Sequence, residues 1–197
     1  MNDEKRMIRS YEVRESFNIG KSEIVIAEDL NAVNGMCYMI ADYHMNELFA
    51  RYENIVLSDS YLEILEQFQE RVEKRVGELR REQSKITVPL DVIEADMCTQ
   101  NDYAKSIEGK IIAIRQEVLK PEYRNQASQL MLVTGGNGAR GNARGTAVFC
   151  INLYTGEHSR YERMDVQGVV KPECIPEWAL QKFTDIQKNK NRKEQER

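Results

Sequence analysis

One long amphipathic segment, residues 59–84, constrains the fold more than any other feature of the sequence. Its apolar side chains follow one another at steps of four or three residues, which places them on one side of an α-helix. They are Tyr61, Leu65, Phe68, Val72, Val76 and Leu79, and we call this row the seam. Ser58-Asp59 supplies an N-cap, and most other positions are charged. The segment predicts a helix whose seam packs on the protein's own sheet or first helix, or against the same helix of a second copy in a homodimer.

The remainder of the first half predicts one strand and one further helix. Residues 23–27 are rich in β-formers and follow the turn signal Asn18-Ile19-Gly20. In residues 37–52 the apolar positions recur at three- and four-residue steps, which indicates a buried helical stripe. These positions are Cys37, Ile40, Ala41, His44, Met45, Leu48, Phe49 and Tyr52. We therefore expect an N-terminal strand followed by two amphipathic helices.

The second half predicts an antiparallel β-meander and a C-terminal helix. Short β-rich runs occupy residues 110–115, 129–134, 146–153 and about 160–166. The last helix follows Pro176, with Trp178, Phe183 and Ile186 as docking residues. Helices first and strands second favour an α+β fold. We expect one domain over 1–187, with a helical part at about 11–85, a β-meander part at about 86–187, and a disordered polar tail at 188–197.

Composition indicates a soluble, cytoplasmic protein. Of the 197 residues, 41% are hydrophobic and 30% charged, as in globular proteins. No apolar run approaches the roughly 20 residues that span a bilayer, and no signal-peptide core follows the charged start. The four cysteines form no CxxC pair, so we expect reduced thiols and no membrane contact.

The charges are unevenly divided along the chain. Residues 1–100 carry 12 Lys and Arg against 20 Asp and Glu, a net charge of −8. Residues 101–197 carry 16 against 12, a net charge of +4. Such an asymmetry indicates binding partners for two unlike surfaces.

A glycine-rich segment at 135–145 holds five of the eleven glycines. Its GxGxxG match at 136–141 leads into the strand-like residues 146–153, whereas a dinucleotide site needs a helix there. No Lys-Ser or Lys-Thr follows for a P-loop, so we expect no cofactor. The alternatives are a solvated connector or a flexible hairpin loop that presents arginines to phosphates or carboxylates. The candidate basic face comprises Arg140 and Arg144 of this loop, with Arg124, Arg160 and Arg163.

Residues for catalysis are sparse. His44 lies within an apolar stripe, and its spacing from Cys37 matches no zinc motif. Asp42, Glu47 and Asp102 form no recognised metal-binding or acid–base pattern. We therefore expect a protein that is not an enzyme and holds no metal.

Three stretches carry a resemblance to a known family: residues 37–49, Asn101-Asp102-Tyr103, and residues 133–138 with Arg144-Gly145. In these stretches the chain resembles the type II-A anti-CRISPR proteins, Cas9 inhibitors encoded on mobile elements of gut Clostridia. The resemblance extends over about residues 11–187. It implies a cytosolic, non-enzymatic protein that binds Cas9, alone or loaded with guide RNA, and prevents productive engagement of target DNA.

Both halves of the chain offer a surface for such a partner. Cas9-type effectors hold nucleic acid in a strongly positive channel, which an acidic surface could occupy. The acidic candidates are Glu63, Glu66, Glu70 and Glu73 on the helix at 59–84, although Arg71, Lys74, Arg75, Arg80 and Arg81 share that helix and weaken simple DNA mimicry. The Arg140 and Arg144 loop is expected to touch DNA or an acidic patch of Cas9. The alternative function is a DNA-binding accessory or antirestriction protein of a conjugative element or phage.

Overall fold

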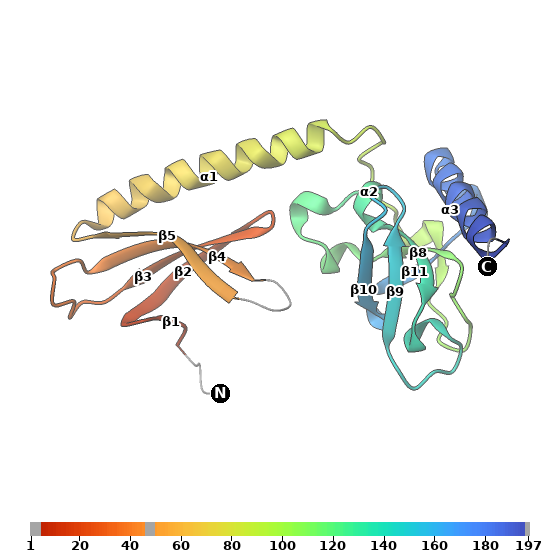
Figure 1. Cartoon of the computed structure of the whole chain (residues 1–197), viewed down its shortest axis with the longest axis horizontal. Coiled ribbons are helices and arrows are strands. Elements are labelled where there is room, and N and C mark those ends of the chain that lie inside the picture. The colour runs from red at the N-terminus through yellow and green to blue at the C-terminus, as the bar shows by residue number, and fades with distance from the viewer. Residues whose placement is uncertain (1–4, 46–49, 196–197) are drawn as a thin grey trace. The chain divides into compact units, whose positions relative to one another are not determined.

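The computed structural model describes residues 5–45 and 50–195 and divides into two compact units (Figure 1). The first is Met1–Lys85 and the second Ile86–Arg197. Within the described residues, no helix is both long and apolar enough to cross a membrane.

The first unit is a five-stranded antiparallel sheet followed by one long helix. The strands are β1 (Met7–Ile8), β2 (Tyr11–Ile19), β3 (Ser22–Glu28), β4 (Tyr38–Met45) and β5 (Ala50–Ser58), and they lie in sequence order. Helix α1 (Tyr61–Ser84) then runs along one face of the sheet (Figure 1). Its N-cap is Ser60, whose side chain accepts a hydrogen bond from the Glu63 backbone N–H.

The expected helix at 37–52 is wrong, and so is the fold class built on two N-terminal helices. Apart from Cys37, which precedes β4, its described residues belong to β4 and β5, which pair as neighbours with Tyr43 opposite Tyr52. Ile40 packs on the face beneath α1, whereas Met39 and Ala41 pack on the opposite face. A strand buried on both faces is apolar at nearly every position, so three- and four-residue steps arise without a helix. The predicted stripe positions Leu48 and Phe49, and the candidate Glu47, lie outside the described residues.

Helix α1 packs on its own sheet, although not along the centre of the seam. Ile64 is fully buried above Ile24, Ile26 and Ile40. Phe68 and Val72 join this cluster, and the Phe68 ring lies 4.7 Å from that of Phe17 on β2. The opposite face of the sheet buries a second cluster. The sheet therefore has an apolar layer on each side.

The second unit is a six-stranded antiparallel sheet in the order β10-β9-β8-β7-β11-β6. Its elements are β6 (Cys98–Gln100), β7 (Ile111–Ile114), α2 (Gln126–Gln129), β8 (Leu130–Gly135), β9 (Ala147–Asn152), β10 (His158–Glu162), β11 (Val166–Val170) and α3 (Glu177–Gln195). Short 3-10 helices join them at Ala95–Met97, Gln116–Val118, Pro121–Tyr123, Asn137–Ala139, Arg163–Asp165 and Pro172–Cys174. Strands β7 to β10 form the expected meander, and β11 then inserts between β7 and β6. The protein as a whole thus consists mostly of antiparallel β-sheet.

The C-terminal helix packs on the sheet of this second unit. Trp178, Phe183 and Ile186 lie against the cluster of buried residues that includes Ile111 and Leu132, which confirms their predicted docking role. Trp178 also donates a hydrogen bond from its indole N–H to the Gln126 side chain, at 3.0 Å. Helix α3 continues to Gln195 and so includes most of the segment expected to be a disordered tail.

Candidate binding surfaces

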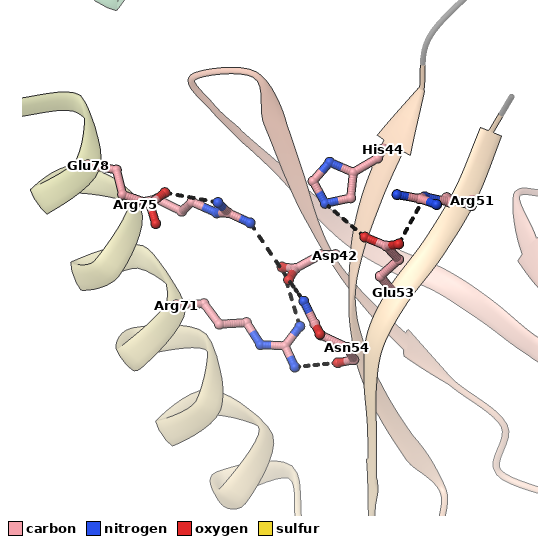
Figure 2. Close-up of polar contacts among 8 residues, drawn as sticks. All are labelled: Asp42, His44, Arg51, Glu53, Asn54, Arg71, Arg75 and Glu78. Atoms are coloured by element: carbon pink, nitrogen blue, oxygen red, sulfur yellow. Dashed lines mark hydrogen bonds and ion pairs between the residues drawn. The ribbon is translucent and has the colours of Figure 1, made fainter. Parts of the chain in front are cut away.

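A buried carboxylate connects α1 to the sheet of the first unit (Figure 2). Asp42 on β4 is only 4% exposed and points toward the helix. Its two oxygens lie 3.4 Å from Arg71 Nη1 and 3.8 Å from Arg75 Nη2. A third donor, the Asn54 side-chain amide, lies 2.7 Å from Asp42 Oδ2. A buried carboxylate requires such partners, so this cluster is a structural connection between helix and sheet.

A β-bulge places Asn54 in this cluster. Ile40 pairs with Val56 and Asp42 with Glu53, so one extra residue is accommodated on β5. Asn54 takes a left-handed conformation, with φ of 52°, which asparagine tolerates better than most residues. Its carbonyl accepts a hydrogen bond from Arg71 Nη2 at 2.6 Å. Arg71 therefore binds both the carboxylate and the bulge.

These contacts change the expected charge pattern of α1. Arg71 and Arg75 lie on the sheet side of the helix, one turn apart, and their side chains are only 13% and 22% exposed. Arg75 also pairs with Glu78 at 2.9 Å. The sequence analysis missed this role. The available signal was the spacing of Ile64, Phe68, Arg71 and Arg75, whose steps of four and three residues place them on one side of the helix.

The carboxylates expected to bind a partner have two different environments. Glu63 is part of the helix start, because its carboxylate accepts a hydrogen bond from the Ser58 hydroxyl at 2.6 Å. Glu66, Glu70 and Glu73 are exposed and have no ion pair among the described residues. Their spacing of four and three residues places them along one side of α1, away from the sheet. We call these three residues the acidic row.

In the second unit, the glycine-rich segment connects the antiparallel neighbours β8 and β9, and its backbone packs closely against other parts of the unit. Added Cβ atoms would lie 2.1 Å from the Thr146 carbonyl oxygen at Gly138 and 2.4 Å from that of Ala104 at Gly141. The Ala139 carbonyl accepts the Ile107 N–H at 2.8 Å. The glycines therefore permit close backbone packing.

Arg163, in the 3-10 helix Arg163–Asp165, has its side chain buried beside this loop and is not available to a partner. It is only 2% exposed and donates hydrogen bonds to the backbone carbonyls of Gly138, Asp102 and Lys105, at 3.2, 2.9 and 3.3 Å. Its guanidinium lies 5.4 Å from the centre of the Tyr103 ring. Burial lowers the pKa of this guanidinium. Arg163 is thus a structural residue that joins residues 102–105 to the glycine loop, and its assignment to the basic face was wrong.

The other four arginines of the expected basic face differ in their availability. Arg160 forms an ion pair with Glu162 at 2.6 Å. Arg124 donates from Nε to the carbonyls of Gln116 and Leu119. Arg140 and Arg144 are exposed and have no partner among the described residues. The basic candidates for a partner are therefore these last two.

The possible catalytic groups each take part in separate contacts within their own unit. His44 lies 3.7 Å from Glu53, which also pairs with Arg51 at 2.9 Å (Figure 2). Asp42 is occupied by the α1 arginines, and Asp102 belongs to the second unit. The Ala104 N–H lowers the pKa of Asp102 by its hydrogen bond to the carboxylate. Across residues 5–45 and 50–195, no group of three or more His, Cys, Asp or Glu side chains could hold a metal ion.

Comparison with known proteins adds no relative: no family model, curated protein or solved structure matches the chain.

Proposed function

We propose that this protein is a non-enzymatic inhibitor of Cas9 and that the acidic row of α1 contacts the positively charged nucleic-acid channel. The observation that supports the proposal is the inward position of Arg71 and Arg75, which are bound to Asp42. Two of the arginines that would offset the acidic row are removed from it. The identity of the partner comes from the family resemblance of the sequence.

The acidic row has the chemistry required for this contact. Glu66, Glu70 and Glu73 present three unpaired carboxylates along about two helical turns. Carboxylates pair well with the arginines and lysines that otherwise hold phosphates. The helix is anchored to a sheet, so it presents these charges on a rigid element.

The test is a reconstituted Cas9 cleavage reaction in which the protein is added before or after guide loading. The wild-type chain should inhibit cleavage by at least one orthologue. Glu66→Gln, Glu70→Gln and Glu73→Gln together should raise the half-inhibitory concentration by about tenfold or more, since each lost charge pair contributes on the order of 0.5–1 kcal/mol. The matched control replaces three exposed glutamates elsewhere, Glu15, Glu117 and Glu173, by glutamine. Full cleavage at excess wild-type protein with every orthologue tested would overturn the proposal.

The second candidate function is DNA binding by an accessory or antirestriction protein. It is favoured by the exposure of Arg140 and Arg144, held on a loop whose backbone is fixed by close glycine contacts. Arginines on a rigid loop suit phosphate oxygens. Retention of duplex or single-stranded DNA without Cas9, lost on added salt and in the Arg140→Ala, Arg144→Ala variant, would support it. Unchanged retention and inhibition in that variant would exclude the loop from either function.

A further inference from the structure

Two loops of the second unit lie against each other. The Ala139 carbonyl accepts a hydrogen bond from the Ile107 N–H at 2.8 Å, and the Asn142 N–H donates one to the Tyr103 carbonyl at 2.9 Å. We call these two segments the paired loops: residues 103–107 and 139–144. Because their backbones are joined by hydrogen bonds, the exposed side chains that they carry belong to one surface of the unit.

The paired loops carry three exposed cations and one exposed aromatic residue. Arg140 and Arg144 are exposed, the Lys105 side chain is 77% exposed, and Tyr103 is 54% exposed. Asp102 lies 3.4 Å from Lys105 and accepts a hydrogen bond from the Ala104 N–H. Residues 101–110 and 135–145 together carry four Lys or Arg against two Asp or Glu, a net charge of +2 in a chain of net charge −4. The surface is therefore basic although the protein is acidic.

The ring of Tyr103 is held in place from inside the protein. The guanidinium carbon of Arg163 lies 5.4 Å from the ring centre. Arg163 is itself fixed by its hydrogen bonds to the carbonyls of Asp102 and Lys105, on either side of Tyr103 in the sequence. A cation–π contact of this kind orients the ring, and more than half of the residue stays exposed. The ring is thus a fixed platform on which another flat ring can stack.

A small pocket beside the paired loops adds a fourth cation. Lys105 and Lys110 both line this pocket, whose volume is about 220 Å³. Lys110 is exposed and has no ion pair among the described residues. Two ammonium groups at one pocket suit a phosphate, which accepts charge-assisted hydrogen bonds from several donors. The pocket is smaller than the roughly 300–1,000 Å³ typical for whole drug-sized ligands, so it suits one group of a longer molecule.

We propose that the paired loops bind single-stranded nucleic acid, with one base stacked on Tyr103 and the neighbouring phosphates held by Arg140, Arg144 and the two pocket lysines. Cations that follow a backbone, together with an exposed aromatic ring, are the combination that binds single strands. A duplex keeps the faces of its bases inside the stack, so Tyr103 has no role in binding one. The proposal rests on the second candidate function, to which it adds the kind of nucleic acid, and it is independent of the acidic row.

The test is fluorescence anisotropy of a labelled strand of about 12 nucleotides, titrated with the full chain at low salt. DNA and RNA strands of one sequence are compared with the matching duplex and with an abasic strand that keeps the same phosphates. The single strand should bind about tenfold more tightly than the duplex. The abasic strand should bind about tenfold more weakly than the normal strand, because a base stacked on an aromatic side chain contributes about this much. Tight binding of either the DNA or the RNA strand supports the proposal, and the tighter of the two identifies the source.

Substitutions separate the roles of the ring and the cations. Tyr103→Leu should weaken binding of the normal strand by about tenfold and leave binding of the abasic strand unchanged, whereas Tyr103→Phe keeps the ring and should bind like the wild type. Tyr61→Leu is the matched control, because Tyr61 is 41% exposed and lies in the first unit. Arg140→Ala with Arg144→Ala should reduce the slope of log affinity against log salt by about 1.4, since each phosphate contact to a single strand contributes about 0.7.

The outcomes distinguish this proposal from the function on which it rests. If the duplex and the abasic strand bind as tightly as the normal single strand, the proposal is wrong and the second candidate function stands. If none of these nucleic acids binds at low salt, both are wrong. The abasic strand needs no change to the protein, so its result decides the matter even where Tyr103→Leu does not fold. Equal affinities of wild type and a folded Tyr103→Leu protein for the normal strand also contradict the proposal.

Discussion

Replacement of Arg163 by methionine should destabilise the second unit by about 3 kcal/mol. Methionine keeps much of the apolar stem but donates no hydrogen bond. The carbonyls of Asp102, Lys105 and Gly138 would each lose a donor. A typical hydrogen bond contributes about 1 kcal/mol net, and bonds to a charged donor contribute more. Burial of the charged guanidinium is itself unfavourable, as its lowered pKa shows. Removal of this charge offsets part of the loss, so the expected decrease in the free energy of unfolding is close to that of three ordinary hydrogen bonds.

Urea unfolding followed by fluorescence isolates this effect, because Trp178 is the single tryptophan of the chain and lies in the second unit. The control is Arg160→Met, which removes an exposed ion pair with Glu162 and should cost less than about 1 kcal/mol. Hydrogen exchange should also accelerate at the Ile107 and Asn142 amides, which bond across the two loops. If Arg163→Met changes the unfolding free energy no more than Arg160→Met and the exchange stays slow, the assigned role of Arg163 is incorrect.

Three further predictions concern glycine and cysteine. Gly138→Ala should cost about 2 kcal/mol or more in the same fluorescence assay, because its Cβ would lie 2.1 Å from the Thr146 oxygen. Gly77→Ala on α1, where a Cβ meets nothing within 4 Å, should instead stabilise the helix by about 1 kcal/mol in thermal melts followed by circular dichroism. Burial raises the pKa of the Cys150 thiol from 9.0 to about 12. The neutral thiol therefore makes its full contribution to the free energy of unfolding below pH 9, and this contribution is lost as pH rises toward 12. Wild type should therefore lose about 2 kcal/mol relative to Cys150→Ala by about pH 10.5, and parallel pH profiles would contradict this.

The sequence predicted elements best where one face of an element alone is buried. Helix α1 has a long polar surface, so its periodicity was clear and its bounds agree closely with those observed. The β4–β5 hairpin has no such contrast, because β4 is buried on both faces and mimics a helical stripe. Periodicity cannot separate a doubly buried strand from a buried helix of similar length. Because this one segment is a pair of strands and not a helix, the expected fold class was wrong.

Only those features of the candidate site that depend on residues close together in the sequence could be predicted. The acidic row could be placed from helical spacing, and the exposure of Arg140 and Arg144 agrees with their position in a loop. The burial of Arg163 could not be predicted, because the carbonyls that surround it come from residues 102–105 and 138, distant in sequence. The glycines suggested freedom of the backbone, whereas here they allow backbones to approach closely.

A single buried carboxylate keeps two arginines of α1 on the side of the sheet. Asp42 lies close to both Arg71 and Arg75, so the acidic row is clear of these two arginines. Asp42→Ala should release both arginines and so weaken the proposed Cas9 inhibition, although Asp42 lies outside the acidic row. A folded Asp42→Ala protein, verified by circular dichroism, that inhibited as strongly as the wild type would show that the acidic row does not depend on this carboxylate.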